Sequence, residues 1–316
     1  MVQAKLEVAI REPADRVRIL DLRGPITRSA QEPLTAAYKE ASSGDVEVII
    51  LNFREVEAMD SYGLGLLIAL QARAQRQKQR LVACGPSVPL RTAFAATYLD
   101  EALPVYDDEV SALAAPMEAP VAQDLEDSGV GPQRQWARPV ERLSVPDLPK
   151  EAVNLNVQGR RPTGPMKGFG PLWLRTYQIR LTGSTTTAAE VVQAWKQQFA
   201  SFWPPGSHFY GADRPIQTGD VGVLNLAGPA GTTIATGIWV IYADEESFCF
   251  LSVEGHMFGG MITFGAYEED GTTVAQVQVM LRSSDPVYEL GQRLGFAVEA
   301  EDRFWHGALT NLASHF

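Results

Sequence analysis

The chain has 316 residues, 45% of them hydrophobic and 21% charged, which is enough for about two globular domains with sizeable cores. Its net charge of −11 argues against a nucleic-acid-binding face, because phosphate contacts require clustered Lys and Arg. The basic run over residues 73–80 is interpreted as the solvated face of a helix.

Cysteine usage and hydropathy indicate where the protein works. Its two cysteines, Cys84 and Cys249, lie in apolar runs and are expected to be buried free thiols, which fits a reducing compartment. The sequence has no apolar run of about 18 residues, and its N-terminus lacks an apolar signal core. We therefore expect a cytoplasmic protein without membrane insertion.

The first third of the chain alternates strand and helix patterns. Residues 5–10 and 15–22 predict two strands joined by a turn that contains Pro13, and residues 28–42 predict a helix. The later elements are strands over 46–51, 80–84 and 105–106, and helices from Asp60 and over 88–97 and 107–114. Short connections between such elements are typical of a buried sheet flanked by helices.

The most informative motif follows the strand that ends at Leu51 and reads Asp60-Ser61-Tyr62-Gly63-Leu64-Gly65-Leu66-Leu67. Asp60 or Ser61 is the expected N-cap, because either side-chain oxygen can accept from the free amides of the first turn. A hydroxyl there is expected on the surface, beside the positive end of the helix dipole. Gly63 and Gly65 predict close packing, since a glycine inside a helix costs about 1 kcal/mol and needs a reason.

This strand, turn and helix resemble the phosphorylation segment of STAS domains, the anti-sigma-factor antagonists. The resemblance covers residues 1–115 and implies an α/β STAS domain, a mixed sheet flanked by helices. It implies that an anti-sigma factor or serine kinase is the partner and that Ser61 is phosphorylated. The partner-binding residues that it implies are Asp60, Ser61, Tyr62, Gly63 and Thr27.

One turn departs from the family pattern. Where the family usually has an Asp after the second strand, this chain reads Gly24-Pro25-Ile26-Thr27. Thr27 is therefore a second candidate phosphorylation site, with an ordinary turn threonine as the alternative. Asp60 has two roles open to it, since it can orient the Ser61 hydroxyl or cap the helix.

Residues 116–170 are rich in Pro and Gly and lose all periodicity, which predicts a partly ordered linker. A structureless loop of about 50 residues is unusual inside a compact domain. Residues 153–157 are therefore a candidate short strand docked on one of the domains.

Residues 171–316 predict a second domain. A strand over 173–181 precedes a helix capped by Thr185, Thr186 or Thr187, and a helix is expected from Pro286 to the end of the chain. Between them, strands are expected over 221–226, 233–242, 247–253, 261–267 and 273–281. This order resembles the SRPBCC (START-like) superfamily, which implies an α+β helix-grip fold: a curved antiparallel sheet around a long C-terminal helix and an apolar cavity.

Aromatic residues are numerous in this second domain, and most must form its core. Apolar pockets are built from the same side chains, and the candidate cavity residues are Trp195, Phe199, Trp239, His256, Phe258, Phe264 and Trp305. For His256 the alternative is a core or turn histidine. The four histidines lack zinc-site spacing, and no P-loop or dinucleotide fingerprint occurs, so we expect neither a metal nor a cofactor.

Three functions are consistent with these patterns. In the first, a non-enzymatic signalling protein binds an anti-sigma factor or kinase when Ser61 is unphosphorylated, and its C-terminal domain senses an apolar small molecule. In the second, the helix-grip domain is a carrier or enzyme for a lipid or aromatic molecule, and the STAS domain is used for docking. In the third, the STAS domain is an assembly module that self-associates independently of Ser61. The Ser61 motif favours the first function. No catalytic constellation in the sequence supports the enzyme of the second.

Overall fold

The computed structural model describes residues 5–115, 135–228 and 231–316, and the chain divides into two compact units, Met1–Gln133 and Arg134–Phe316. The boundary between the units falls in the Pro- and Gly-rich part of the sequence. Each unit has its own sheet, and each is described by itself below.

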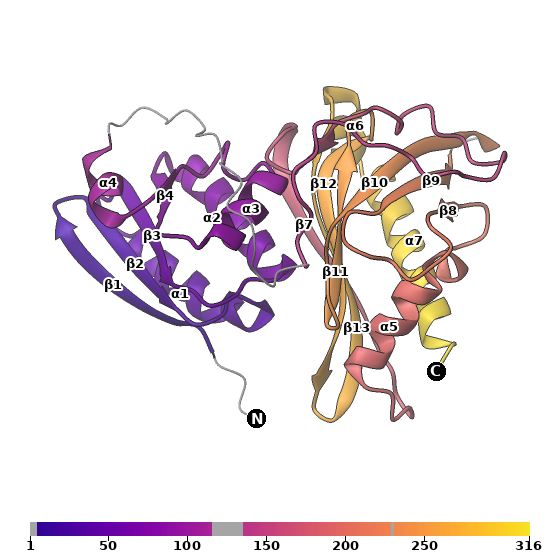
Figure 1. Cartoon of the computed structure of the whole chain (residues 1–316), viewed down its shortest axis with the longest axis horizontal. Coiled ribbons are helices and arrows are strands. Elements are labelled where there is room, and N and C mark those ends of the chain that lie inside the picture. Colours follow the sequence, from indigo (N-terminus) through magenta and orange to yellow (C-terminus); the bar gives the residue numbers. More distant parts are fainter. Residues whose placement is uncertain (1–4, 116–134, 229–230) are drawn as a thin grey trace. The chain divides into compact units, whose positions relative to one another are not determined.

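The first unit is built on a five-stranded mixed sheet in the order β1-β2-β3-β4-β5, which confirms the predicted sheet type (Figure 1). β1 and β2 form an antiparallel hairpin, and the other neighbours are parallel. The strands are β1 (Glu7–Ala14), β2 (Val17–Arg23), β3 (Val48–Glu55), β4 (Arg80–Cys84) and β5 (Val105–Tyr106). The hairpin turn lies beyond Pro13, at Arg16 with φ 59°, because Pro13 lies in edge strand β1, where a missing N–H is tolerated.

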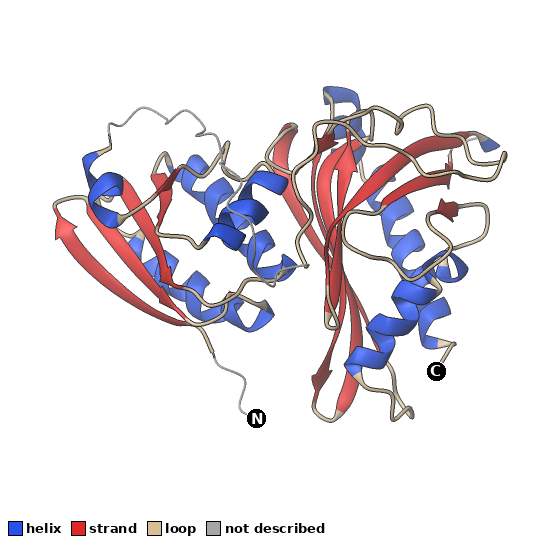
Figure 2. Ribbon diagram, in the orientation of Figure 1, coloured by secondary structure: helices blue, strands red, loops and turns tan. Residues whose placement is uncertain are grey.

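Helices cover both faces of this sheet (Figure 2). They are the 3₁₀ helix η1 (Arg28–Ala30), α1 (Gln31–Ala41), α2 (Ser61–Gln77), α3 (Val88–Ala96) and α4 (Glu109–Ala114). Ala112 of α4 packs on one face, against a cluster that includes Ile50 of β3. Phe53 points to the opposite face, since Ile50 and Phe53 are an odd number of residues apart, and its ring meets Phe94 of α3 edge to face with centroids 5.6 Å apart.

The second unit is an antiparallel sheet of eight strands with helices on one face (Figures 1 and 2). The strand order is β7-β13-β12-β11-β10-β9-β8, and β6 pairs with β11. The strands are β6 (Pro162–Thr163), β7 (Phe169–Arg180), β8 (His208–Tyr210), β9 (Val221–Ala227), β10 (Thr233–Ala243), β11 (Ser247–Val253), β12 (Phe258–Glu269) and β13 (Thr272–Ser283). The helices are α5 (Ala188–Gln197), η2 (Phe199–Phe202), α6 (Pro286–Arg293) and α7 (Phe296–Ala313).

An aromatic cluster fills the centre of the space between the sheet, α5 and α7. The ring of Phe264 lies 4.7 Å from Phe248, 5.2 Å from Phe199 and 5.5 Å from Trp305, centroid to centroid. Edge-to-face and offset pairs of this kind add about 0.5–1.5 kcal/mol each beyond their buried area. The protein's own side chains therefore occupy the middle of this layer.

The segment before β7 differs from the prediction, because residues 153–157 form no strand. The Asn225 side chain accepts from the Val153 N–H at 3.0 Å and donates to its carbonyl at 2.9 Å, so these groups need no strand partner. β6 is the short strand instead, paired with Ser252 and Val253. The described part of the predicted linker, from residue 135 on, thus packs within the second unit, while residues 116–134 lie outside the described residues.

The single C-terminal helix predicted from Pro286 onward is divided into α6 and α7. Gly295 lies between them with φ 87°, a left-handed conformation that ends a helix at little cost for glycine. Asp285 caps α6 by accepting from the N–H groups of Val287 and Tyr288 at 2.8 and 3.0 Å.

We expect Phe199→Ala to lower the free energy of unfolding of the second unit by about 3–5 kcal/mol, because it leaves a cavity inside the aromatic cluster. Leu155→Ala is the matched control: that side chain is 79% exposed, so its truncation should change stability by less than about 0.5 kcal/mol. Urea unfolding followed by tryptophan fluorescence reports this unit, because all six tryptophans lie in it. Equal losses in both variants would contradict the assigned core.

Candidate functional site

The N-terminus of α2 is fixed by Asp60. This residue is the N-cap, in extended conformation, and its Oδ1 accepts from the Gly63 N–H at 2.8 Å. Its carbonyl accepts from the Leu64 N–H at 3.0 Å, which begins the helix. The sequence left two roles open for Asp60, and the structure shows one of them, capping of the helix.

The loop after β2 lies along the loop that leads into α2. The Ile26 N–H donates to the Ala58 carbonyl at 2.9 Å, and the Asp60 N–H donates to the Ile26 carbonyl at 3.3 Å. Ile26 and Met59 also form an isolated parallel bridge. These bonds bring the Thr27 turn and the Ser61 turn together at one end of the sheet.

Gly63 permits this close approach. A Cβ atom built on Gly63 would lie 2.0 Å from the Ile26 carbonyl oxygen and 2.8 Å from Cγ of Met59. No side chain fits at that separation without displacing backbone. The close packing predicted for Gly63 is thus confirmed, and its neighbour is the loop after β2.

The Ser61 hydroxyl is not on the surface, so that prediction is wrong. The residue has 0% relative exposure, and within the described part of the chain its Oγ has no hydrogen-bond partner. The first turn of α2 is packed against Ile26 and Met59, and therefore its first residue is shielded from solvent. This contact joins two segments that are far apart in the sequence, and local sequence patterns do not predict such contacts.

Other predicted partner-binding residues are within reach of solvent. Thr27, Asp60 and Tyr62 are partly exposed, whereas Gly63 is buried. Thr27 Oγ1 lies 3.1 Å from Oγ of the exposed Ser29. The accessible part of the site is therefore the rim formed by Thr27, Asp60 and Tyr62.

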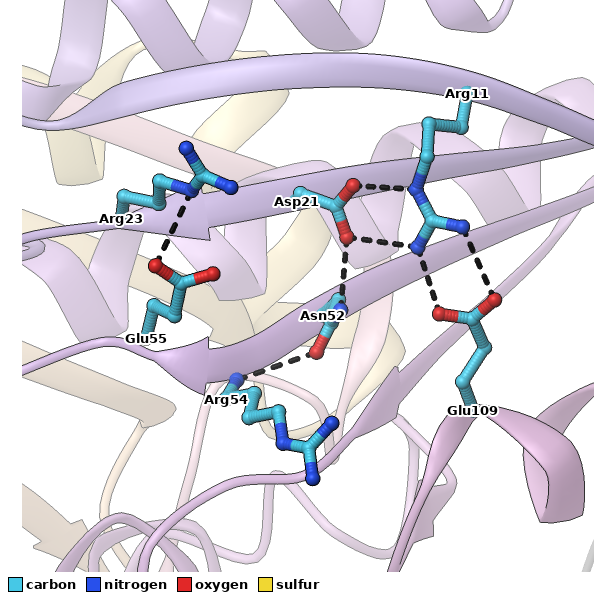
Figure 3. Close-up of polar contacts among 7 residues, drawn as sticks. All are labelled: Arg11, Asp21, Arg23, Asn52, Arg54, Glu55 and Glu109. Carbon is cyan, nitrogen blue, oxygen red and sulfur yellow. Dashed lines mark hydrogen bonds and ion pairs between the residues drawn. The ribbon is translucent and has the colours of Figure 1, made fainter.

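A polar network ties the nearby strands to α4 (Figure 3). The Arg11 guanidinium donates to Asp21 Oδ2 at 2.5 Å and to Glu109 Oε2 at 2.6 Å. Asn52 donates to Asp21 Oδ1 at 2.8 Å and accepts from the Arg54 N–H at 3.2 Å. The bond from Arg11 holds the pKa of Asp21 below its usual value, so this carboxylate remains charged.

The structure brings four of the candidate cavity residues together. Trp195, Phe199, Phe264 and Trp305 belong to one buried cluster, and Phe258 packs against it. Their rings contact one another, as described for the core above.

Trp239 and His256 lie outside this cluster. Trp239 is buried, but it alternates with Ile238 and Val240, which face the cluster, and so it points to the other side of the sheet. His256 lies in the turn before β12, where its Nδ1 accepts from the Phe258 N–H at 3.0 Å. Burial lowers its pKa to about 4, so the ring is neutral at physiological pH.

A partly buried polar group in the second unit was missed by the sequence reasoning. Arg175 Nη1 donates to Glu301 Oε2 at 2.6 Å, with side chains 14% and 10% exposed. Tyr177 donates to Asp302 Oδ1 at 2.7 Å. Burial raises the pKa of both Glu301 and Tyr177. The available signal was Arg175 itself, a charged residue on the apolar side of a predicted strand.

Within the described residues, no group of three or more His, Cys, Asp and Glu side chains is arranged to hold a metal ion. None of the helices in residues 5–115, 135–228 and 231–316 is both long and apolar enough to cross a bilayer.

Comparison with known families identifies part of the chain. The family described as "Mlab, STAS domain" matches residues 10–105, so these residues form a STAS domain. The match lies within the first unit and includes the Thr27 turn, Ser61 and the strands of the polar network. No curated protein sequence matches the chain.

Solved structures similar to the chain include anti-sigma factor antagonists. Unphosphorylated SpoIIAA is 23% identical over 34% of this chain and 94% of its own, with a TM-score of 0.28. The phosphorylated form of Bacillus SpoIIAA is 24% identical over 34% and 96%, with a TM-score of 0.30. A putative anti-sigma factor antagonist from Thermotoga maritima is 19% identical over 34% and 91%, with a TM-score of 0.30.

We expect Gly63→Ala to destabilise the first unit by about 2 kcal/mol or more, because the new methyl group meets the Ile26 carbonyl. Gly291→Ala is the control, since nothing lies within 4 Å of the added Cβ in α6 and alanine favours a helix. Hydrogen exchange resolved by peptide should show faster exchange over residues 24–27 and 58–67 only in Gly63→Ala. Unchanged exchange there would show that the loop does not depend on this contact.

Proposed function

We propose that the STAS domain of this protein binds an anti-sigma factor or serine kinase, as anti-sigma-factor antagonists do, and that phosphorylation of Ser61 switches this binding. The observation that carries the proposal is Ser61 at the Asp60-capped start of α2, held against the Thr27 turn. The family match over residues 10–105 supports the STAS assignment from which this choice of partner class starts.

The docking surface in this proposal is the rim formed by Thr27, Asp60 and Tyr62. These residues are partly exposed. Thr27 and Asp60 lie on two loops that the hydrogen bonds of Ile26 hold together, and Tyr62 lies in the first turn of α2. Loops positioned by a rigid sheet are common sites of recognition. The polar network around Arg11 supports the strand ends from which both loops leave.

Burial of Ser61 determines how the switch operates. A phosphate adds nearly two negative charges and three acceptor oxygens. A fully buried position cannot hold such a group unpaired, because burying an isolated charge is very costly. Phosphoserine must therefore leave the position that Ser61 occupies, which displaces the first turn of α2 or the loop at Ile26. The change alters the shape of the docking rim as well as its charge.

The Ser61 hydroxyl is suited to such a movement. Among the described residues it has no hydrogen-bond partner, so moving the hydroxyl breaks no hydrogen bond of its own. A kinase gains access when the first helical turn opens, and helix ends open locally at a free-energy cost well below that of global unfolding.

The second unit is proposed as a sensing domain of the helix-grip, SRPBCC/START-like type. Its support is the strand order, in which the first long strand, β7, pairs with the last, β13, and the helix α7 that follows packs on the sheet. An apolar small molecule would influence partner binding only if it binds one state of the protein more tightly than the other.

The proposal is tested by calorimetric titration of the full chain with candidate anti-sigma kinases. Ser61→Ala should bind as the native chain does and should be no less stable, because removing a buried hydroxyl that makes no bond leaves no partner unsatisfied. Ser61→Asp should bind at least about tenfold more weakly, since its charge cannot remain buried.

The control is Ser43→Asp, which adds the same charge at an exposed position of the same unit. It should bind like the native chain. Equal affinities of Ser61→Asp and the native chain would contradict the switch. If Ser43→Asp weakened binding as much as Ser61→Asp does, the loss of affinity would come from net charge alone.

A further inference from the structure

The orientation of α6 is the reverse of an ordinary surface helix. Its inward residues are polar, with Glu289 and Gln292 only 7% and 2% exposed. Its outward side is mostly apolar: Val287 and Leu290 are exposed by 76% and 56%, and the C-cap Leu294 by 61%. A surface helix normally buries its apolar stripe. The polar contacts beneath α6 therefore need an explanation.

Space for the inward carboxylate is built into β7. A Cβ atom on Gly170, which has φ 75°, would lie 2.4 Å from Cδ of Glu289. The Glu289 carboxylate accepts from Ser283 Oγ at 3.1 Å and from Arg293 Nε at 2.8 Å. Glu289 is thus fully engaged, and it anchors α6 with its polar side inward.

Gln292 reaches a second set of groups, which we call the polar seat: Arg175, Gln292 and Glu301. Arg175 Nη2 donates to Gln292 Oε1 at 2.6 Å, and Arg175 Nη1 donates to Glu301 Oε2 at 2.6 Å. The guanidinium carbon lies 5.3 Å from the centre of the Trp173 ring. The seat therefore combines a neutralised ion pair with an aromatic wall.

One donor of the seat is unused. Gln292 Nε2 is buried and has no hydrogen-bond partner in the part of the chain that the structure describes. A buried amide N–H without an acceptor is rare, because it loses its bond to water and gains none. An acceptor oxygen from outside the chain would satisfy it.

The surrounding charges restrict what that acceptor can be. Glu301 already neutralises Arg175, and Arg293 pairs with Glu289, so the Asp302 carboxylate leaves the surroundings with an excess of negative charge. A further anion would be repelled, whereas a carbonyl or hydroxyl oxygen would not. Trp173 and Tyr177 belong to the edge of the aromatic core, so the body attached to that oxygen should be apolar.

We propose that the polar seat binds the oxygen of a neutral, largely apolar ketone or alcohol, with α6 as its cover. This inference rests on the proposed sensing role of the second unit and names the class of ligand. The inner side of α6 that faces the seat is polar, and Gly295 with φ 87° ends this helical segment.

The test titrates the full chain with two fluorescent probes. 6-Propionyl-2-dimethylaminonaphthalene carries one carbonyl group, and 2-dimethylaminonaphthalene is its counterpart without that group. We expect saturable binding of the carbonyl probe, at least about tenfold tighter than the other, which is the size of one well-formed hydrogen bond. Gln292→Leu should remove this difference. Gln276→Leu, at a buried glutamine on the sheet, should retain it.

Four outcomes would overturn the inference. If neither probe binds saturably, both the seat and the sensing role of the second unit fail. If the probes bind equally, or Gln292→Leu retains the difference, apolar ligands bind elsewhere: the sensing role stands and the seat fails. Should Gln292→Leu not fold, hydrogen exchange of the native chain replaces it as the test. The carbonyl probe must then slow exchange over residues 286–294. Unchanged exchange there means that Gln292 binds only water, and the seat fails. The Ser61 switch is tested without any probe and is unaffected by these results.

Discussion

The approach of Gly63 to the carbonyl oxygen of Ile26 is the constraint on which the first unit's site depends. It allows the loop after β2 to lie against the first turn of α2, where Ile26 bonds to both Ala58 and Asp60. The same contact places the Thr27 turn beside the helix start and shields Ser61 from solvent. A modification of Ser61 therefore acts on the joint between two loops, and a small chemical change can reshape the whole rim.

The polar networks of the two units differ in their exposure to solvent and in how completely their hydrogen bonds are satisfied. In the first, the network of Arg11, Asp21 and Glu109 is partly exposed and serves to join strands to α4. In the second, Arg175 and Glu301 are largely shielded beneath α6, with side chains 14% and 10% exposed, and the adjacent Gln292 keeps an unused donor. A satisfied network fixes a scaffold, whereas an incompletely satisfied one is expected at a place that binds something.

Local sequence patterns were sufficient to predict most of the helices and strands. The strands Arg80–Cys84 and Ser247–Val253 have the predicted bounds, because each is an apolar run ended by turn residues. Features set by distant contacts were not predictable: the burial of Ser61 depends on Ile26, and the irregular path at Val153 depends on the Asn225 side chain. The break at Gly295 was visible as a glycine in a helical pattern, but only its positive φ distinguishes a helix end from an interior glycine.

The most direct test of the central claim is to map phosphate on the purified chain after incubation with candidate anti-sigma kinases and ATP, by intact mass and peptide fragmentation. We expect a single phosphate on Ser61, absent in Ser61→Ala, together with faster hydrogen exchange in the first turn of α2 and over residues 24–27. A phosphate on Ser61 that leaves exchange in both segments unchanged would contradict the coupling of modification to shape. Phosphate on Thr27 alone, or none with any kinase, would contradict Ser61 as the switch.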